Sequence, residues 1–424
     1  MEKNITLKVE DLDVSGQLIY ENDNKSEIFL TLPKNKSHYF KNFFDNPEAF
    51  NINGKFEDNC EFTAYYSHVI QALHTPKNDS LAENLKALID FHSNEESDIL
   101  IKYKIDIGKL YLNASDVSDE MYVKKVDVKF SSIDQWIPND ENKKIFIETN
   151  KCHIDISNDF IGIETSDPVS LKQLNEIVFD LRVFFEVVVL SSDIQAIQKF
   201  IYTVDGNKIQ EVMHYKNREK AKEEFLFAYD VNSIENILNR WFEAKNTYGK
   251  IFDYLSGILN ESSSVYLDLK YFTLAQWMEA YSREFIKNEV YSIIDSVIQK
   301  NDDKILLKSQ CQNQNSFRKN LNNIFKIRGL DEVCFGRNNR NERDDLIHDI
   351  ICYRNNLTHL NIIDNLNHTQ MMHLYELLKN IIYLLVMEEL GTRSYQEYQN
   401  ICDEIKQKYK MYITLRKTIE KCKD

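Results

Sequence analysis

The sequence predicts an α+β protein, in which an N-terminal antiparallel β domain is followed by a C-terminal all-α bundle. Apolar residues alternate with a period of two up to about residue 164, as in half-buried strands, and recur at helical spacing from residue 232 onward. A chain of 424 residues, 43% of them hydrophobic, can bury more than one core. We therefore expect two domains, residues 1–220 and residues 221–424.

The β domain is expected to contain several short strands. Asn158-Asp159 offers a turn between two of them, and a capping box that starts at Ser80 predicts a short helix. The alternating apolar residues are Ile5/Leu7/Val9, Val126/Val128/Phe130, Ile154/Ile156 and Ile161/Ile163.

Between the two patterns, residues 170–190 have helical periodicity, and Asp205-Gly206-Asn207 predicts a hairpin turn. The bundle begins with a helix at Asn232, and Gly391 is a plausible helix stop. We expect an up-and-down bundle with an additional C-terminal helix. Its later helices are predicted at residues 266–287, 302–327, 344–356, 368–390 and 394–421.

Composition limits the possible functions. Only 10 Gly and 5 Pro argue against long flexible linkers, and the net charge of -15 means that any nucleic-acid contact must use a local patch. The seven cysteines include no C-x-x-C pair, which favours reduced thiols over a disulfide framework or a zinc site. With no apolar signal core at its start and no run long enough to span a bilayer, we expect a cytoplasmic protein without membrane contact.

Polar residues collect at the end of the predicted helix 344–356, at Arg354, Asn355 and His359. Five residues of α-helix turn about 500°, so Arg354 and His359 would lie roughly 140° apart and could not line one site within a single helix. Either the helix frays at the β-branched Thr358, or a second copy of the segment completes the site.

The segment 353–359, YRNNLTH, resembles the R-N-x-x-x-H signature of HEPN ribonucleases. Together with residues 271–280, YFTLAQWMEA, it is similar to the HEPN domain of ApeA-type anti-phage proteins. Residues 14–20 and 28–32 look like the opening hairpin of that family's N-terminal domain. The resemblance implies an ApeA-like domain before a HEPN domain, and a homodimeric endoribonuclease of phage defence by abortive infection, with a phage-derived trigger.

The chemistry needs no metal or cofactor, because RNA carries its own nucleophile, the 2′-OH. Such a site needs a base of near-neutral pKa and a planar cation for the phosphate. His359 would supply the base and Arg354 the cation, with Asn355 orienting the phosphate or the partner arginine by amide hydrogen bonds.

RNA contact is expected along residues 304–343, where nine Lys or Arg outnumber three acids, directly before the Arg354 segment. A solvated helix face is the alternative interpretation of this stretch. The RNA-binding candidates are Arg318, Lys319, Arg328, Arg337, Arg340 and Arg343.

Other interpretations remain open. The helical half could be a non-catalytic module that dimerises, binds RNA or senses a phage component, or the β half could be a carbohydrate or protein receptor. Gln276 and Glu279, one turn apart, resemble a recurrent pair of this family, although a Glu on an amphipathic helix is more often solvated than part of a site. A metal site at His348, His368 and His373 is disfavoured because no carboxylate cluster accompanies them.

Overall fold

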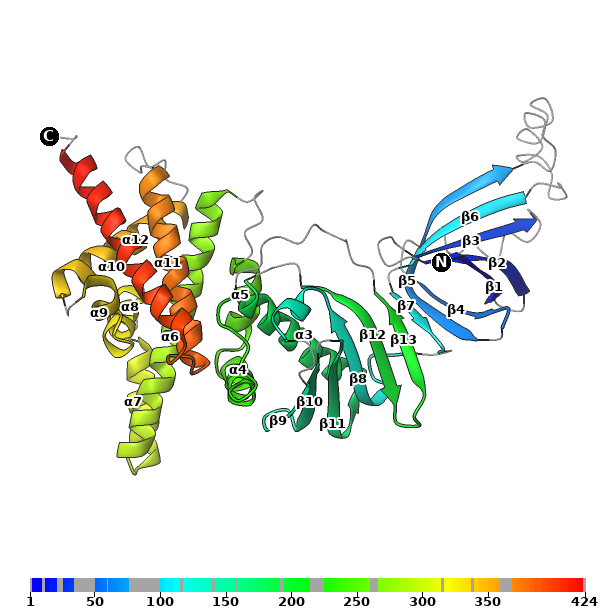
Figure 1. Cartoon of the computed structure of the whole chain (residues 1–424), viewed down its shortest axis with the longest axis horizontal. Coiled ribbons are helices and arrows are strands. Elements are labelled where there is room, and N and C mark those ends of the chain that lie inside the picture. Colours follow the sequence, from blue (N-terminus) through cyan, green and yellow to red (C-terminus); the bar gives the residue numbers. More distant parts are fainter. Residues whose placement is uncertain are drawn as a thin grey trace. The chain divides into compact units, whose positions relative to one another are not determined.

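The computed structural model confirms the predicted fold class, an antiparallel sheet followed by a helical region (Figure 1). The described residues are 2–9, 12–20, 26–33, 50–58, 60–75, 100–107, 109–114, 117–138, 142–157, 159–190, 194–213, 225–259, 266–313, 316–336, 339–358 and 368–421.

Contacts divide the chain into two compact units. The first contains residues 1–146, 150–182 and 194–221, and the second contains residues 147–149, 183–193 and 222–424. A division into domains after residue 220 stays a prediction.

The first unit contains a 13-stranded sheet in the order β4-β1-β2-β3-β6-β5-β7-β13-β12-β8-β11-β10-β9. An additional pairing between β4 and β5 closes its first six strands into a ring around the core residues Leu7, Leu18, Leu30 and Phe62. The strands of this ring are β1 (Glu2–Val9), β2 (Leu12–Ile19), β3 (Ser26–Pro33), β4 (Phe50–Phe56), β5 (Glu61–Thr75) and β6 (Leu100–Ile107).

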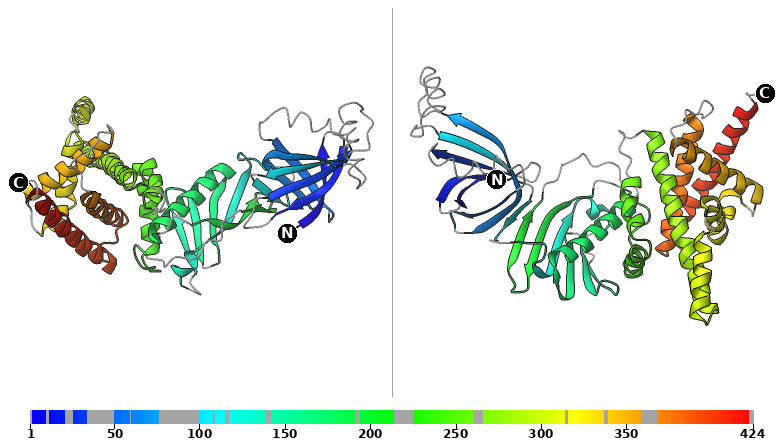
Figure 2. Two further views of the ribbon diagram at one scale, coloured as in Figure 1. Left: turned by 90° about the horizontal axis from the view of Figure 1, so that it is seen from above. Right: turned by 180° about the vertical axis from the view of Figure 1, so that it is seen from behind.

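The remaining strands form an open extension of the sheet. Helix α3 (Leu171–Val188) crosses one face of this extension (Figure 2), and from there Asn175 accepts a hydrogen bond of 2.7 Å from the buried Lys199 on β12. The extension consists of β7 (Lys109–Leu112), β8 (Tyr122–Phe130), β9 (Asn142–Ile147), β10 (Cys152–Ser157), β11 (Ile161–Ser170), β12 (Ala196–Thr203) and β13 (Lys208–Val212), with the 3₁₀ turn η2 (Ile133–Gln135) between β8 and β9.

The predicted strands are confirmed where the structure describes them. Ile5 and Leu7 of β1 are buried, as are the alternating apolar residues of β8, β10 and β11. Strands β12 and β13 pair across the predicted turn at Gly206, and β2 pairs with β3. Helix α3 matches the prediction for residues 170–190. The helix predicted from Ser80 and the turn residue Asn158 lie outside the described residues.

In the second unit, aromatic side chains that include Trp241, Phe252 and Tyr281 form a continuous core, and the long helix α6 contacts α8, α10 and α11. The helices are α4 (Ile234–Tyr248), α5 (Lys250–Leu259), α6 (Leu267–Val297), α7 (Asn301–Asn313), α8 (Phe317–Ile327), α9 (Leu330–Phe335), α10 (Arg340–Thr358), α11 (His368–Glu389) and α12 (Gln396–Lys421).

The single helix predicted at residues 302–327 was wrong, because two helices, α7 and α8, occupy it. Ser316 has an extended backbone, and its hydroxyl accepts a hydrogen bond of 3.3 Å from the backbone N–H of Lys319, which caps the start of α8. Helix α6 also continues ten residues beyond the predicted end at Lys287.

Gly391 ends α11 as predicted, with a positive φ of 73°. The N–H of Thr392 donates to the carbonyl of Met387 at 2.9 Å, and the N–H of Gly391 donates to Glu388 at 3.1 Å. This pair of hydrogen bonds is a Schellman motif, which satisfies carbonyls that the helix end leaves open.

Candidate active site at the end of helix α10

Arg354 lies one turn before the end of α10, and two neighbours orient its guanidinium. Nη2 forms an ion pair with the carboxylate of Glu279 on α6, and Nη1 donates to Asn355 Oδ1 at 3.0 Å. The Arg354 side chain is 24% exposed and that of Glu279 is 31% exposed. A guanidinium held this way keeps N–H groups available for a phosphate while its plane is fixed.

Asn355 is exposed, and its carbonyl oxygen already accepts from Arg354. Its Nδ2 group is therefore the part that could donate to a substrate phosphate. The hydroxyl of Thr358, one turn later, donates to the carbonyl of Arg354 at 2.9 Å. Thr358 is the last residue of α10. His359 lies outside the described residues, so fraying of the helix after Thr358 stays a prediction.

Tyrosines fix α10 against its neighbours just before the Arg354-Asn355 pair. Tyr271 on α6 donates to the carbonyl of Ile350 at 2.9 Å, and Tyr353 donates to Gln370 Oε1 on α11 at 3.3 Å. Burial raises the pKa of Tyr353 to about 12 and that of Tyr271 well above its usual value, so both remain protonated donors at neutral pH.

Helix α12 also contacts α10, through Asp349. This carboxylate accepts a hydrogen bond from Tyr412 and lies 3.2 Å from Arg416. Burial raises the pKa of Asp349, although both contacts favour its charged form. The polar contacts of α10 with α6, α11 and α12 therefore set where Arg354 lies.

Two of the predicted site residues, His359 and Arg337, lie outside the described residues. The structure therefore brings together Arg354 and Asn355 of the expected catalytic set, and the role of His359 stays a prediction.

Three of the predicted RNA-binding residues are exposed. Arg318 and Lys319 lie in the first turn of α8, and Arg340 begins α10 with its side chain 82% exposed. Arg318 also contacts the exposed His348 of α10, with Nη2 and Nδ1 2.9 Å apart. These residues can meet a phosphate backbone without unfolding any part of the bundle.

Arg343 is buried, contrary to the expectation of RNA contact. Its side chain is 3% exposed, forms an ion pair with Asp331 and donates to Asn322 Oδ1 at 3.0 Å. The sequence places it among exposed cations, but its position on α10 turns it toward α8 and α9. Arg343 is therefore not accessible to RNA.

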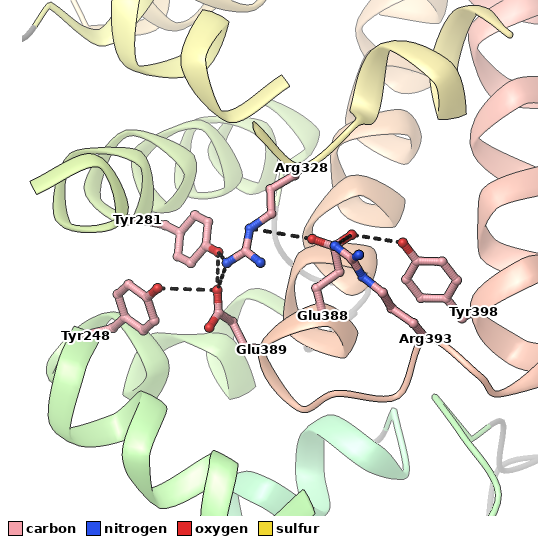
Figure 3. A network of polar contacts seen from close by, with 7 residues as sticks. All are labelled: Tyr248, Tyr281, Arg328, Glu388, Glu389, Arg393 and Tyr398. Atoms are coloured by element: carbon pink, nitrogen blue, oxygen red, sulfur yellow. Dashed lines mark hydrogen bonds and ion pairs between the residues drawn. The ribbon is translucent and has the colours of Figure 1, made fainter. Parts of the chain in front are cut away.

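Arg328 is also committed to internal contacts (Figure 3). Its guanidinium pairs with Glu389 and lies 3.5 Å from Glu388, and it donates to the hydroxyl of Tyr281 at 3.3 Å. Glu388 in turn accepts from Tyr398 at 2.8 Å and pairs with Arg393 at 2.9 Å. Because this network joins α6, α8, α11 and α12, Arg328 is a structural residue. The prediction that it contacts RNA was wrong.

Glu279 is the candidate site residue for which the sequence interpretation favoured a solvated role over a site role. It was expected to be solvated, whereas it forms the ion pair with Arg354. One signal was present: Glu279 is the only carboxylate between residues 269 and 283.

Within the described residues, no three His, Cys, Asp or Glu side chains are grouped as a metal ion would require, and no helix is long and apolar enough to cross a membrane. His348 lies on α10 and His373 on α11, and neither belongs to such a group.

The Arg354-Asn355 pair lies at a helix end in a region that matches a model of HEPN domains, a class whose members are typically nucleases. More particularly, residues 272–396 match the family described as Apea-like HEPN, so this segment is an ApeA-type HEPN domain. The matched segment runs from α6 to the start of α12 and includes Glu279, Arg354 and Asn355. The chain matches no curated protein and no solved structure.

Proposed function

We propose that this protein is a metal-independent endoribonuclease of anti-phage defence. The observation that supports the proposal most directly is the orientation of the Arg354 guanidinium by Glu279 and Asn355, within a segment that matches the Apea-like HEPN family. A fixed planar cation is what a transition state with charge on phosphate oxygens needs.

In the proposed reaction the ribose 2′-oxygen attacks the adjacent phosphorus and the bond to the 5′-oxygen breaks. His359 accepts the proton of the 2′-OH, and the leaving 5′-oxygen gains a proton from a second acid. Arg354 stabilises the charge on the phosphate, and Asn355 donates an amide N–H to it. The products are a 2′,3′-cyclic phosphate and a 5′-hydroxyl.

Two further parts belong to this proposal. A homodimer would supply the second histidine, and abortive infection after a phage-derived trigger would be the biological outcome. RNA would lie over the exposed cations Arg318, Lys319 and Arg340, with Arg337 as a further candidate. The protein as a whole repels RNA through its charge of -15, so this surface has to provide the local attraction.

The test is cleavage of RNA by the purified full chain, with and without EDTA, followed by mapping of the product ends. We expect cleavage that survives chelation, fails at a single 2′-deoxy position, and leaves cyclic phosphate ends. Arg354→Ala and His359→Ala should be inactive, while Arg283→Ala, which removes an exposed arginine from α6, should cleave like the wild type. Cleavage of DNA, a strict Mg²⁺ requirement or 5′-phosphate ends would contradict the mechanism.

The competing function is a non-catalytic module for dimerisation, RNA binding or phage sensing, in which the Arg354–Glu279 pair only holds two helices together. It predicts that Arg354→Ala lowers the melting temperature and that no variant changes cellular RNA. New discrete RNA ends in cells that express the wild type, absent with a folded His359→Ala variant, would favour the enzyme.

A further inference from the structure

Cys352 lies on α10, two residues before Arg354, in a cluster that the proposed reaction does not use. Its Sγ is 3.4 Å from His348 Nε2 and 3.7 Å from Nδ1, one helical turn back. Arg318 of α8 approaches the same imidazole, with its Nη2 2.9 Å from Nδ1. The cluster thus joins a thiol, an imidazole and a guanidinium on the surface between α8 and α10.

Arg318 determines which nitrogen of the neutral His348 imidazole carries the proton. A guanidinium can only donate hydrogen bonds, so Nδ1 is the acceptor and the neutral imidazole carries its proton on Nε2. That N–H faces Cys352 Sγ, where a thiolate would accept it and would also feel the positive charge of Arg318. The same arrangement disfavours a metal ion, because Nε2 bears a proton and the Nδ1 lone pair is already used.

We propose that Cys352 is a modification site for soft electrophiles and small disulfides, and that an adduct there blocks the RNA-binding surface beside the proposed active site. With a small disulfide, the Cys352 thiol loses its proton to solvent and the thiolate attacks one sulfur. The S–S bond of the reagent breaks, a mixed disulfide forms on Cys352, and the second sulfur leaves as a thiolate that takes up a proton. The regulatory part of this inference rests on the proposed nuclease function.

The position of the adduct follows from helical spacing. His348, Cys352 and Asn355 are separated by four and three residues, so they line one face of α10, on which His348 and Asn355 are exposed. A group the size of a tripeptide on Cys352 would lie between Arg318 and Asn355, two residues that the proposed function assigns to RNA contact.

The other four cysteines whose side chains the structure describes provide internal controls. Cys60 is fully exposed, but Asp58 hydrogen-bonds to it and raises the pKa of its thiol. Burial raises the pKa of Cys152 to about 12 and also raises those of Cys334 and Cys402. Exposure alone would make Cys60 the first of these five to react, whereas the cluster makes Cys352 the first.

The test is the alkylation of the folded full chain by limiting iodoacetamide, with the rate at each cysteine measured by peptide mass spectrometry. Among the five cysteines whose side chains the structure describes, Cys352 should react first, about tenfold faster than Cys60, and His348→Ala should remove most of that difference. A faster reaction at Cys60, or an unchanged Cys352 rate in His348→Ala, would overturn the proposal.

A second measurement uses glutathione disulfide as the reagent and RNA cleavage as the readout. The wild type should lose cleavage as the adduct on Cys352 accumulates and recover it after thiol reduction, whereas Cys352→Ser should cleave equally well before and after treatment. Cleavage that persists with Cys352 fully modified would overturn the regulatory role. If the untreated chain never cleaves RNA, the nuclease proposal fails, and the alkylation rates still decide whether Cys352 is a modification site.

Discussion

Glu279 of α6 and Arg354 of α10 are 75 residues apart in the sequence and form an ion pair at the candidate active site. Both side chains are partly exposed, so the pair contributes about 0–1 kcal/mol to stability. Its larger effect is on geometry, because a free arginine side chain samples many rotamers and a paired one keeps its plane.

Replacing Glu279 by Gln should therefore lower kcat at least about tenfold, with a smaller change in KM, because positioning of a transition-state contact is lost. The melting temperature should stay near that of the wild type. Glu284→Gln is the matched control, since Glu284 lies on the same helix and pairs with Lys287. Equal activity of the two variants would show that Glu279 has no positioning role.

Arg343→Met should destabilise the second unit by about 3–5 kcal/mol, because it leaves the buried carboxylate of Asp331 without its partner. The double variant Arg343→Met/Asp331→Leu should recover much of that loss. Urea unfolding of the three proteins measures both effects. A stable Arg343→Met protein with weakened RNA binding would return Arg343 to the RNA surface.

Arg340→Ala should leave stability unchanged, since the Arg340 side chain is 82% exposed. It should reduce the slope of log RNA affinity against log salt concentration by about one. Lys287→Ala, at an exposed cation of α6, provides the comparison. Titrations at several salt concentrations give the slopes. The same slope for Arg340→Ala as for the wild type would place the RNA on another surface.

Glu388 should make stability depend on pH. Burial raises its pKa above the ordinary 4.5, so the folded protein holds the proton at a pH where the unfolded chain has lost it. The cost of burying the charge is absent at low pH and grows as pH rises from 4.5 through the raised value. Between pH 4.5 and the raised pKa, the free energy of unfolding of the wild type should therefore fall relative to that of Glu388→Gln. A difference that is constant with pH would show that Glu388 titrates normally.

Mixing Arg354→Ala with His359→Ala protein tests whether two copies share a site. In a dimer with shared sites, one mixed site retains both intact residues, so partial activity should return on mixing. Neither variant alone should cleave. A fully active wild-type monomer in sedimentation would exclude the shared arrangement.

The sequence predicted the fold class and most elements because their signals are local. Alternation at Val126, Val128 and Phe130 needs only one buried face, and the stop at Gly391 needs only a residue that tolerates positive φ. The break at Ser316 was missed because it depends on one capping hydroxyl within an otherwise continuous helical pattern.

The candidate site was predictable only in part. Arg354 and Asn355 belong to a short motif, but the partner of Arg354 comes from a helix 75 residues away, and no local rule pairs the two. The same limit explains Arg328 and Arg343. Both lie in a basic stretch, yet each lies within 4 Å of a buried acid from another helix, a pairing that only tertiary packing reveals.

The ring closure between β4 and β5 has a consequence for how copies of this protein meet. In the described part of the sheet it leaves β9 as the only strand with a strand neighbour on a single side. An unpaired edge invites the strand of another molecule, and natural proteins discourage this with charged side chains. Strand β9 carries consecutive lysines, Lys143 and Lys144, so edge-to-edge addition of a second copy would bring four positive charges together. The protein thus resists growth into a continuous intermolecular sheet.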